Sequence, residues 1–155
     1  MTIRAISPCP ASNRTLLETD DSPLPIDGWH LRHHVQANGR SLIEISDALG
    51  DLAALIMSTS LPMLTVDAGW RGRGYDAHGT QQWWALAIGH ASVSDAHEPV
   101  VTFTRRAGRH QLLRRATVQP LRTRGLWIAS VPGLYTAVSC RQEVRYTVRR
   151  LVTHR

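Results

Sequence analysis

One stretch, Ser41 to Ser58, has a hydrophobic pattern that restricts the fold more than any other part of the chain. Its large apolar residues recur at steps of three and four, as on one face of an α-helix with about 3.6 residues per turn. They are Leu42, Ile45, Leu49, Leu52 and Ile56. Ser41 and Glu44 have the spacing of a capping box, in which each side chain satisfies a backbone N–H at the helix N-terminus. The sequence therefore predicts an amphipathic helix over about 41–58, with Leu49 in the core and a solvated acidic face.

The length and composition fit one globular domain. The chain has 155 residues, which is enough to bury a hydrophobic core. No apolar run reaches the roughly 18 residues of a membrane-spanning helix, and nothing at the N-terminus resembles a secretory signal. Cys9 and Cys140 are too few for a disulfide framework and suit a reducing compartment. We therefore expect a cytoplasmic protein that does not contact a membrane.

The basic residues are all arginine, 18 in number, and their distribution is uneven. Residues 1–66 carry four arginines and seven acidic residues, and residues 67–100 carry two and four. Residues 101–155 carry twelve arginines and one acidic residue, a net charge of +11. Charge asymmetry of this size concerns partners more than fold. We therefore expect the last third to bind nucleic acid, another polyanion or an acidic protein surface.

The N-terminal part of the chain gives weaker signals. Residues 1–26 are rich in proline and small polar residues, which is typical of an irregular or mobile arm. Residues 27–36 fit either a short helix or a strand with alternating apolar residues that ends in a hairpin turn at Asn38-Gly39. The capping box at Ser41 favours the helix.

The second half of the chain predicts β-structure. A short strand is expected at 62–68, followed by a loop at Gly69–Gln82, which contains four glycines. From Trp83 apolar residues alternate with period two, as in a half-buried strand. Further strands are expected at 99–105, 111–118, 126–131, 134–140 and 143–152. Their short connections require antiparallel pairing.

The predicted fold class is therefore α+β. An N-terminal arm precedes a single domain at 27–155, which has a helical part centred on about 41–58 and an antiparallel sheet over about 83–152.

Arginine and aromatic residues of the predicted loop and sheet are the candidate binding residues. Arginine beside aromatic rings on a flexible backbone suits base stacking with phosphate contacts, or a protein interface. In the last predicted strand, Arg145 and Arg149 alternate with Val144, Tyr146 and Val148, which predicts outward arginines and inward apolar residues. The full set of candidates is Trp70, Arg71, Arg73, Tyr75, Arg105, Arg114, Arg145 and Arg149.

The chain also contains possible metal ligands and catalytic groups. Asp-Ala-His occurs at Asp76–His78 and at Asp95–His97. An intervening strand would separate the two copies by more than about 30 Å, at the rise of an extended chain. We therefore expect no shared metal site and no cofactor. Asp76 and His78 form a candidate acid–base pair, but no Ser or Cys nucleophile accompanies them in a recognisable context.

These patterns predict a non-enzymatic binding module whose basic C-terminal sheet engages nucleic acid or an acidic protein partner. One alternative is a structural or assembly subunit, either a homo-oligomer or part of a larger complex, whose arm and loop order against neighbouring chains. Another is a small enzyme that uses Asp76 and His78. Titration of nucleic-acid binding against salt separates the first function from the other two.

Overall fold

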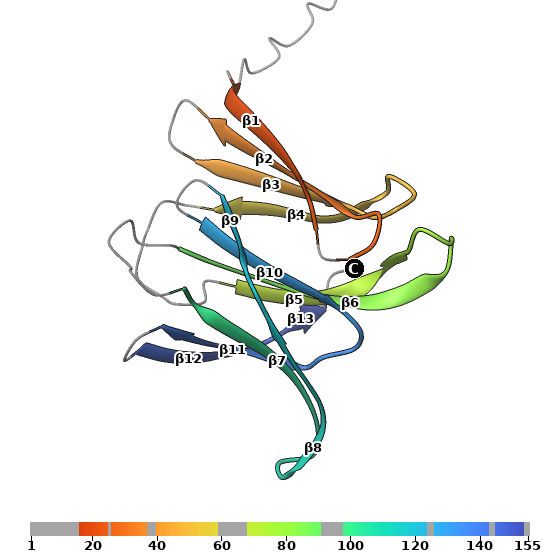
Figure 1. The fold of residues 1–155 in the computed structure, drawn as a ribbon, viewed down its shortest axis with the longest axis vertical. Helices are drawn as coiled ribbons and strands as arrows, with labels where there is room; N and C mark the ends of the chain where they lie inside the picture. Colours follow the sequence, from red (N-terminus) through yellow and green to blue (C-terminus); the bar gives the residue numbers. More distant parts are fainter. Residues whose placement is uncertain are drawn as a thin grey trace, which may run out of the picture.

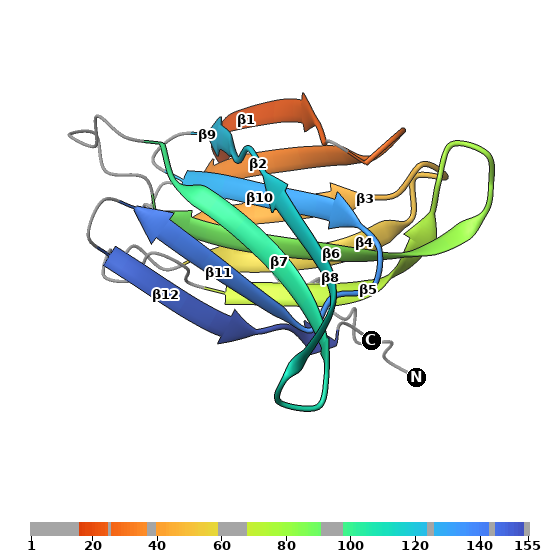
Figure 2. The same ribbon diagram turned by 60° about the horizontal axis from the view of Figure 1, so that its bottom comes forward.

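The computed structural model describes residues 16–24, 26–36, 40–58, 68–90, 98–123, 126–142 and 145–153. Within these ranges the chain forms thirteen β-strands and no helix. The predicted α+β class is therefore wrong, and the described part of the chain is all-β. The strands make three sheets that lie as successive layers (Figures 1 and 2). We call these layers sheet A, sheet B and sheet C.

Sheet A is an antiparallel meander in which four consecutive strands pair in chain order. Its strands are β1 (Leu16–Pro23), β2 (His30–Gln36), β3 (Ser41–Ser46) and β4 (Leu52–Ser58). The first of them falls within the segment predicted as an arm, whose first fifteen residues lie outside the described ranges. For residues 27–36, the strand alternative is confirmed by β2.

The stretch predicted as a helix is the β3–β4 hairpin. Ile43 and Ile45, two residues apart, are fully buried in β3, whereas Leu49 is 59% exposed in the turn. Gly50 has a φ of 85°, in the left-handed region that favours glycine, and it helps the chain reverse after Asp47. The helical spacing in the sequence is a coincidence. Apolar residues lie within β3 and within β4, and the exposed Leu49 in the turn between them completes steps of three and four. The prediction that Leu49 lies in the core is therefore wrong.

Sheet B is the central layer. Its strands are β5 (Ala68–Tyr75), β6 (Gln81–His90), β9 (Leu121–Thr123), β10 (Leu126–Pro132) and β13 (Val152–Thr153). They pair in the order β13-β5-β6-β10-β9, and β13 runs parallel to β5 while the other neighbours are antiparallel. The residues predicted as a strand at 62–67 lie outside the described ranges.

The predicted Gly-rich loop is mostly strand, because β5 and β6 take up all of it except the turn between them. A Cβ atom on Gly72 would lie 2.8 Å from a ring carbon of Trp84, so only glycine fits beneath this ring. The indole of Trp29 covers Gly74 in the same way, and its Nε1 donates a hydrogen bond to the Tyr75 carbonyl at 2.8 Å. The glycines therefore mark close aromatic contacts within a strand.

Sheet C is the second outer layer. Its strands are β7 (Val100–Ala107), β8 (Gln111–Val118), β11 (Ala137–Gln142) and β12 (Arg145–Arg150), in the order β12-β11-β7-β8. The prediction of β-strands in this half of the chain is confirmed, but the single antiparallel sheet predicted over about 83–152 is wrong, because these strands are divided between sheets B and C. The chain leaves sheet C after β8, adds β9 and β10 to sheet B, and returns with β11 beside β7.

Sheet B is buried on both faces, and this creates two hydrophobic cores. In β6, Trp84, Leu86 and Ile88 pack against sheet A, whereas Ala85 and Ala87 pack against sheet C. The expectation of a half-buried strand from this alternation is therefore wrong, since the small residues are as buried as the large ones. Central strands covered on both sides typically have such continuous apolar runs.

Candidate anion-binding surface

The two outer layers carry opposite charge. The four strands of sheet C contain eight arginines, two in β7, two in β8, one in β11 and three in β12, and no acidic residue. In contrast, the described residues between 16 and 58, which form sheet A and its turns, contain seven acidic residues and two arginines. The central sheet separates these layers (Figure 1). The charge asymmetry of the sequence is therefore an asymmetry across the thickness of the molecule.

The β7–β8 hairpin extends beyond the body of the layers (Figures 1 and 2). Gly108 lies in its turn at a φ of 63°. Arg106, Arg109 and Arg115 are exposed on the hairpin, and no acidic residue occurs anywhere between residues 100 and 118. The hairpin thus projects positive charge that has no local counter-charge.

In the part of the chain that the structure describes, the outer face of sheet C carries three exposed arginines, Arg115, Arg141 and Arg150. One cross-strand row contains Arg115, Thr104, Ala137 and Arg150. Its first and last members lie three strand spacings apart, about 14 Å. Arg141 and Tyr146 oppose each other further along this face, where Tyr146 is 65% and Val148 is 58% exposed. The face therefore combines spaced cations with an accessible aromatic ring.

The predicted orientation of β12 is wrong. Tyr146 and Val148 face solvent, whereas Arg149 lies opposite the fully buried Val138 and is half-buried. Alternation shows that a strand has two unlike faces, but the neighbouring strands decide which face is covered. Here β11 already supplies Val138 and Cys140 to the core. Arg145, the other predicted outward arginine, is the first residue of β12.

The structure divides the remaining predicted binding residues into two groups. Trp70 packs against the core between sheets A and B, and the backbone of Tyr75 is hydrogen-bonded to Trp29 and Asp47. The second group, which we call the arginine cluster, is located where sheets B and C face each other beside the connection from β10 to β11. It consists of Arg71, Arg73, Arg105 and Arg114.

The arginine cluster contacts aromatic residues at two points. Arg73 lies over the ring of Trp83, its cross-strand neighbour, with Cζ 4.8 Å from the ring centroid. Arg114 lies over the ring of Tyr135 at 5.3 Å. The guanidinium of Arg71 donates a hydrogen bond from Nη1 to the Tyr135 carbonyl at 3.4 Å. Arg71 and Arg114 thus contact Tyr135, in the segment that follows β10, from two different sheets.

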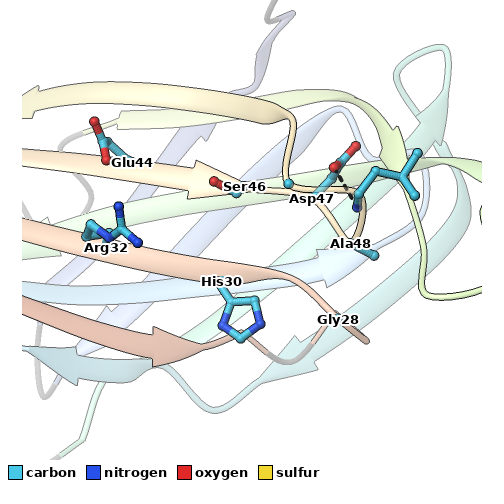
Figure 3. A pocket seen from close by; sticks show the side chains of 9 residues that line it. Gly28, His30, Arg32, Glu44, Ser46, Asp47 and Ala48 are labelled. Carbon is cyan, nitrogen blue, oxygen red and sulfur yellow. Dashed lines mark hydrogen bonds between the residues drawn. The ribbon is translucent and has the colours of Figure 1, made fainter.

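A second feature is a hollow of about 610 Å³ on the outer face of sheet A (Figure 3). His30 and Arg32 of β2, Glu44 of β3 and the turn after β3 line it. Glu44 Oε2 lies 3.1 Å from His34 Nε2. The lining therefore mixes both charges, with one guanidinium, Arg32, and two carboxylates, Glu44 and Asp47.

The Asp76 and His78 pair belongs to the β5–β6 turn. Asp76 Oδ1 accepts hydrogen bonds from the backbone N–H groups of His78 and Thr80, both at 2.9 Å. This is a side-chain turn motif, which engages the carboxylate in shaping the hairpin. In the part of the chain that the structure describes, no three His, Cys, Asp or Glu residues are arranged to hold a metal ion.

Cys140 is buried, and burial raises the pKa of its thiol from 9.0 to about 12.

The sequence-based candidate list missed part of the basic surface. Arg115, Arg141, Arg150 and Tyr146 lie on the open face of sheet C but were not among the candidates. The sequence of β12 contained a signal for them, because Tyr146 lies among closely spaced arginines, a pattern that suits contact with nucleic acid. The register between strands was needed to place these residues on one face.

The described ranges contain no helix that is long and apolar enough to cross a membrane. No known protein family matches the chain, and no curated protein or solved structure shows significant similarity to it.

Proposed function

We propose that this chain is a non-enzymatic binding module whose basic sheet C engages nucleic acid. The observation that carries this proposal is the density of arginine on one outer layer, eight residues in four strands without an acidic residue among them. Arginine forks bind phosphate oxygens through two parallel hydrogen bonds. A layer of this kind supplies sequence-independent affinity for a phosphate backbone.

Pairing with the acidic residues that the structure describes does not neutralise the exposed arginines of sheet C. Among the described residues, no acidic side chain pairs with the exposed arginines of sheet C. Packed sheets lie about 10 Å apart, so the acidic sheet A is about 20 Å from sheet C. This separation exceeds the Debye length of about 8 Å at physiological salt. The exposed arginines of sheet C are therefore available to an external anion.

The outer face of sheet C favours single strands over duplexes. Tyr146 is 65% exposed beside Arg141, and aromatic rings next to cations stack on unpaired bases. Arg115 and Arg150, the two ends of one cross-strand row, are about 14 Å apart, so both can contact phosphates of one extended strand. Tyr146→Ala should therefore weaken binding to single strands more than binding to duplexes.

Fluorescence anisotropy of a labelled single-stranded oligonucleotide, measured over a series of salt concentrations, tests the proposal. Arg115→Gln and Arg150→Gln should each flatten the slope of log K against log salt by about 0.7, the counterion release per phosphate contact on a single strand. Arg122→Gln removes one exposed charge from β9 in sheet B and serves as the control. Equal slopes for all the variants would exclude this face as the binding surface.

A second function is supported by the opposite charges of the two outer layers. Sheet A of one copy is complementary to sheet C of another, and such head-to-tail contacts generate rings or filaments. This agrees with the assembly-subunit alternative. Sedimentation velocity at low and high salt tests it: association should increase with protein concentration at low salt and disappear as salt screens the contact. A monomer at every concentration in low salt would exclude self-assembly.

A further inference from the structure

We propose that the arginine cluster, Arg71, Arg73, Arg105 and Arg114, is a binding site for a terminal phosphate, a phosphomonoester dianion or pyrophosphate. The site is separate from the open face of sheet C, because its arginines belong to the facing sides of sheets B and C. It does not rest on the proposed function, since a small phosphorylated ligand would occupy it equally well.

Two of the cations come from β5. Arg71 and Arg73 are two residues apart in the strand, so they share a face and lie about 7 Å from each other along it. Arg71 is fixed from two directions: Nε donates to Thr153 Oγ1 at 3.2 Å, and Nη1 donates to the Tyr135 carbonyl at 3.4 Å. Among the described residues, these contacts leave the Nη2 amino group of Arg71 for a ligand.

Arg73 is held by stacking. Its guanidinium lies over the Trp83 ring at 4.8 Å, and the Trp83 carbonyl accepts a hydrogen bond from Gly133 N at 2.6 Å. An aromatic ring positions the plane of a guanidinium but does not use its N–H groups. Within the described part of the chain, Arg73 therefore keeps its N–H groups for an anion.

The third cation reaches the same segment from sheet C. Arg114 stacks on Tyr135, the residue whose carbonyl binds Arg71. A Cβ atom on Gly133 would lie 2.7 Å from Arg114 Nη1, and Gly133 has a φ of 121°. Glycine at this position thus leaves the space that the guanidinium occupies. Arginines from two different sheets therefore converge on residues 133–135.

Repulsion between the arginines of the cluster favours the binding of an anion. Arg105 lies directly opposite Arg114 in the β7–β8 pair, and like charges at opposed positions of two strands destabilise the pairing. In the described part of the chain, no acidic side chain pairs with any of the four arginines. A phosphate dianion would relieve this repulsion and accept several charge-assisted hydrogen bonds at once. The oxygens of a phosphate suit planar forks that approach from several directions.

Titration calorimetry and thermal unfolding with inorganic pyrophosphate, at constant ionic strength, test this site. Wild type should bind pyrophosphate saturably, with a melting temperature that rises with ligand concentration. Arg73→Gln and Arg114→Gln should each weaken binding at least about tenfold, because each removes a charged partner of the anion. Arg122→Gln, which removes one charge elsewhere, should bind as wild type does. Equal binding by all four proteins, or no binding by wild type, would overturn the proposal.

Two further measurements complete the test. Arg73→Lys and Arg114→Lys keep the charge but lose the fork, so they should bind pyrophosphate more weakly than wild type even if the glutamine variants fail to fold. Oligonucleotides of one sequence with a 5′-phosphate or a 5′-hydroxyl then separate the sources of the phosphate. Tighter binding of the phosphorylated strand by wild type but not by Arg73→Gln assigns the site to nucleic-acid ends. Equal binding of both strands, with pyrophosphate binding intact, assigns it to a small phosphorylated ligand. Lysine variants that bind pyrophosphate as tightly as wild type would overturn the assignment of the arginine forks.

Discussion

The Asp47 carboxylate joins two layers of the fold, and its removal is a direct test of their packing. Asp47 follows β3 and is 4% exposed. Its Oδ1 accepts hydrogen bonds from the backbone N–H groups of Leu49 at 3.0 Å and Asp51 at 2.9 Å, which close the turn before β4. Its Oδ2 accepts a third from Tyr75 N at 3.0 Å, at the end of β5. One side chain therefore ties a turn of sheet A to sheet B.

The structure allows the cost of losing these bonds to be estimated. A hydrogen bond to a charged group contributes about 1.5–3 kcal/mol to stability. The turn N–H groups belong to the exposed residues Leu49 and Asp51, so water can replace the carboxylate there at a cost of about 0.5–1 kcal/mol each. The Tyr75 N–H lies between layers and loses its partner outright. We therefore expect Asp47→Ala to lower the free energy of unfolding by about 3–4 kcal/mol.

Urea unfolding followed by tryptophan fluorescence measures this change as a shift of the midpoint at constant slope. Asp47→Asn keeps one acceptor oxygen but turns an amide N–H group toward Tyr75 N, so it should cost about 2 kcal/mol. Asp51→Asn alters an exposed carboxylate in the same turn and should change stability by less than about 0.5 kcal/mol. If Asp47→Ala is as mild as Asp51→Asn, the carboxylate does not link the layers and the estimate fails.

The hairpin at 41–58 and the buried thiol give two further predictions. In the same urea assay, Leu49→Asp should change the free energy of unfolding by less than about 0.5 kcal/mol, whereas Ile43→Ala should lower it by about 2–5 kcal/mol. A larger loss for Leu49→Asp than for Ile43→Ala would support the helix predicted from the sequence instead. The pKa of Cys140 is raised to about 12 by burial, so the folded state holds this proton more tightly than the unfolded state does. The resulting stability is present below pH 9 and is lost as pH rises toward 12, at about 1.4 kcal/mol per unit. Wild type should thus lose stability faster than Cys140→Ala above pH 9, and parallel curves would contradict this.

The strands of the C-terminal half could be predicted from the sequence, because their signals are local. Residues 111–118 form β8 with the predicted bounds, and glycine at 108 marks the turn before them. The same reasoning failed at 41–58. There Leu49 of the turn is four residues after Ile45 and three before Leu52, which is the sequence spacing of a helix face. Local hydrogen bonds to Asp47 Oδ1 close this turn, and its position against β5 depends on the contact of Asp47 Oδ2 with Tyr75 N, which is distant in sequence.

The composition of the arginine cluster was partly evident in the sequence, but its geometry was not. All four of its arginines were candidates, because they occur near glycines, aromatic residues or other arginines. Their proximity depends on the position of β5 in sheet B and of β8 in the neighbouring sheet C. The glycines of β5 indicated a loop. In the structure they make room for the rings of Trp84 and Trp29, and the local sequence gives no sign of these contacts. The inward or outward direction of Arg149 depended on β11 in the same way.

The prediction of a basic C-terminal surface did not depend on the fold class, and the topology explains why. Sheet A is a meander of consecutive strands, so the acidic first third of the chain stays in one layer. The strands that follow build sheets B and C, and the apolar and small residues of β6 and β10 are used in the central sheet. Most arginines of the last third therefore lie in the outer layer: eight are in the strands of sheet C, whereas the strands of sheet B contain Arg122 of β9. An interleaved topology, with sheet A strands placed between those of sheet C, would have mixed the charges and cancelled the surface. The path of the chain therefore converts a gradient of charge along the sequence into a charged face.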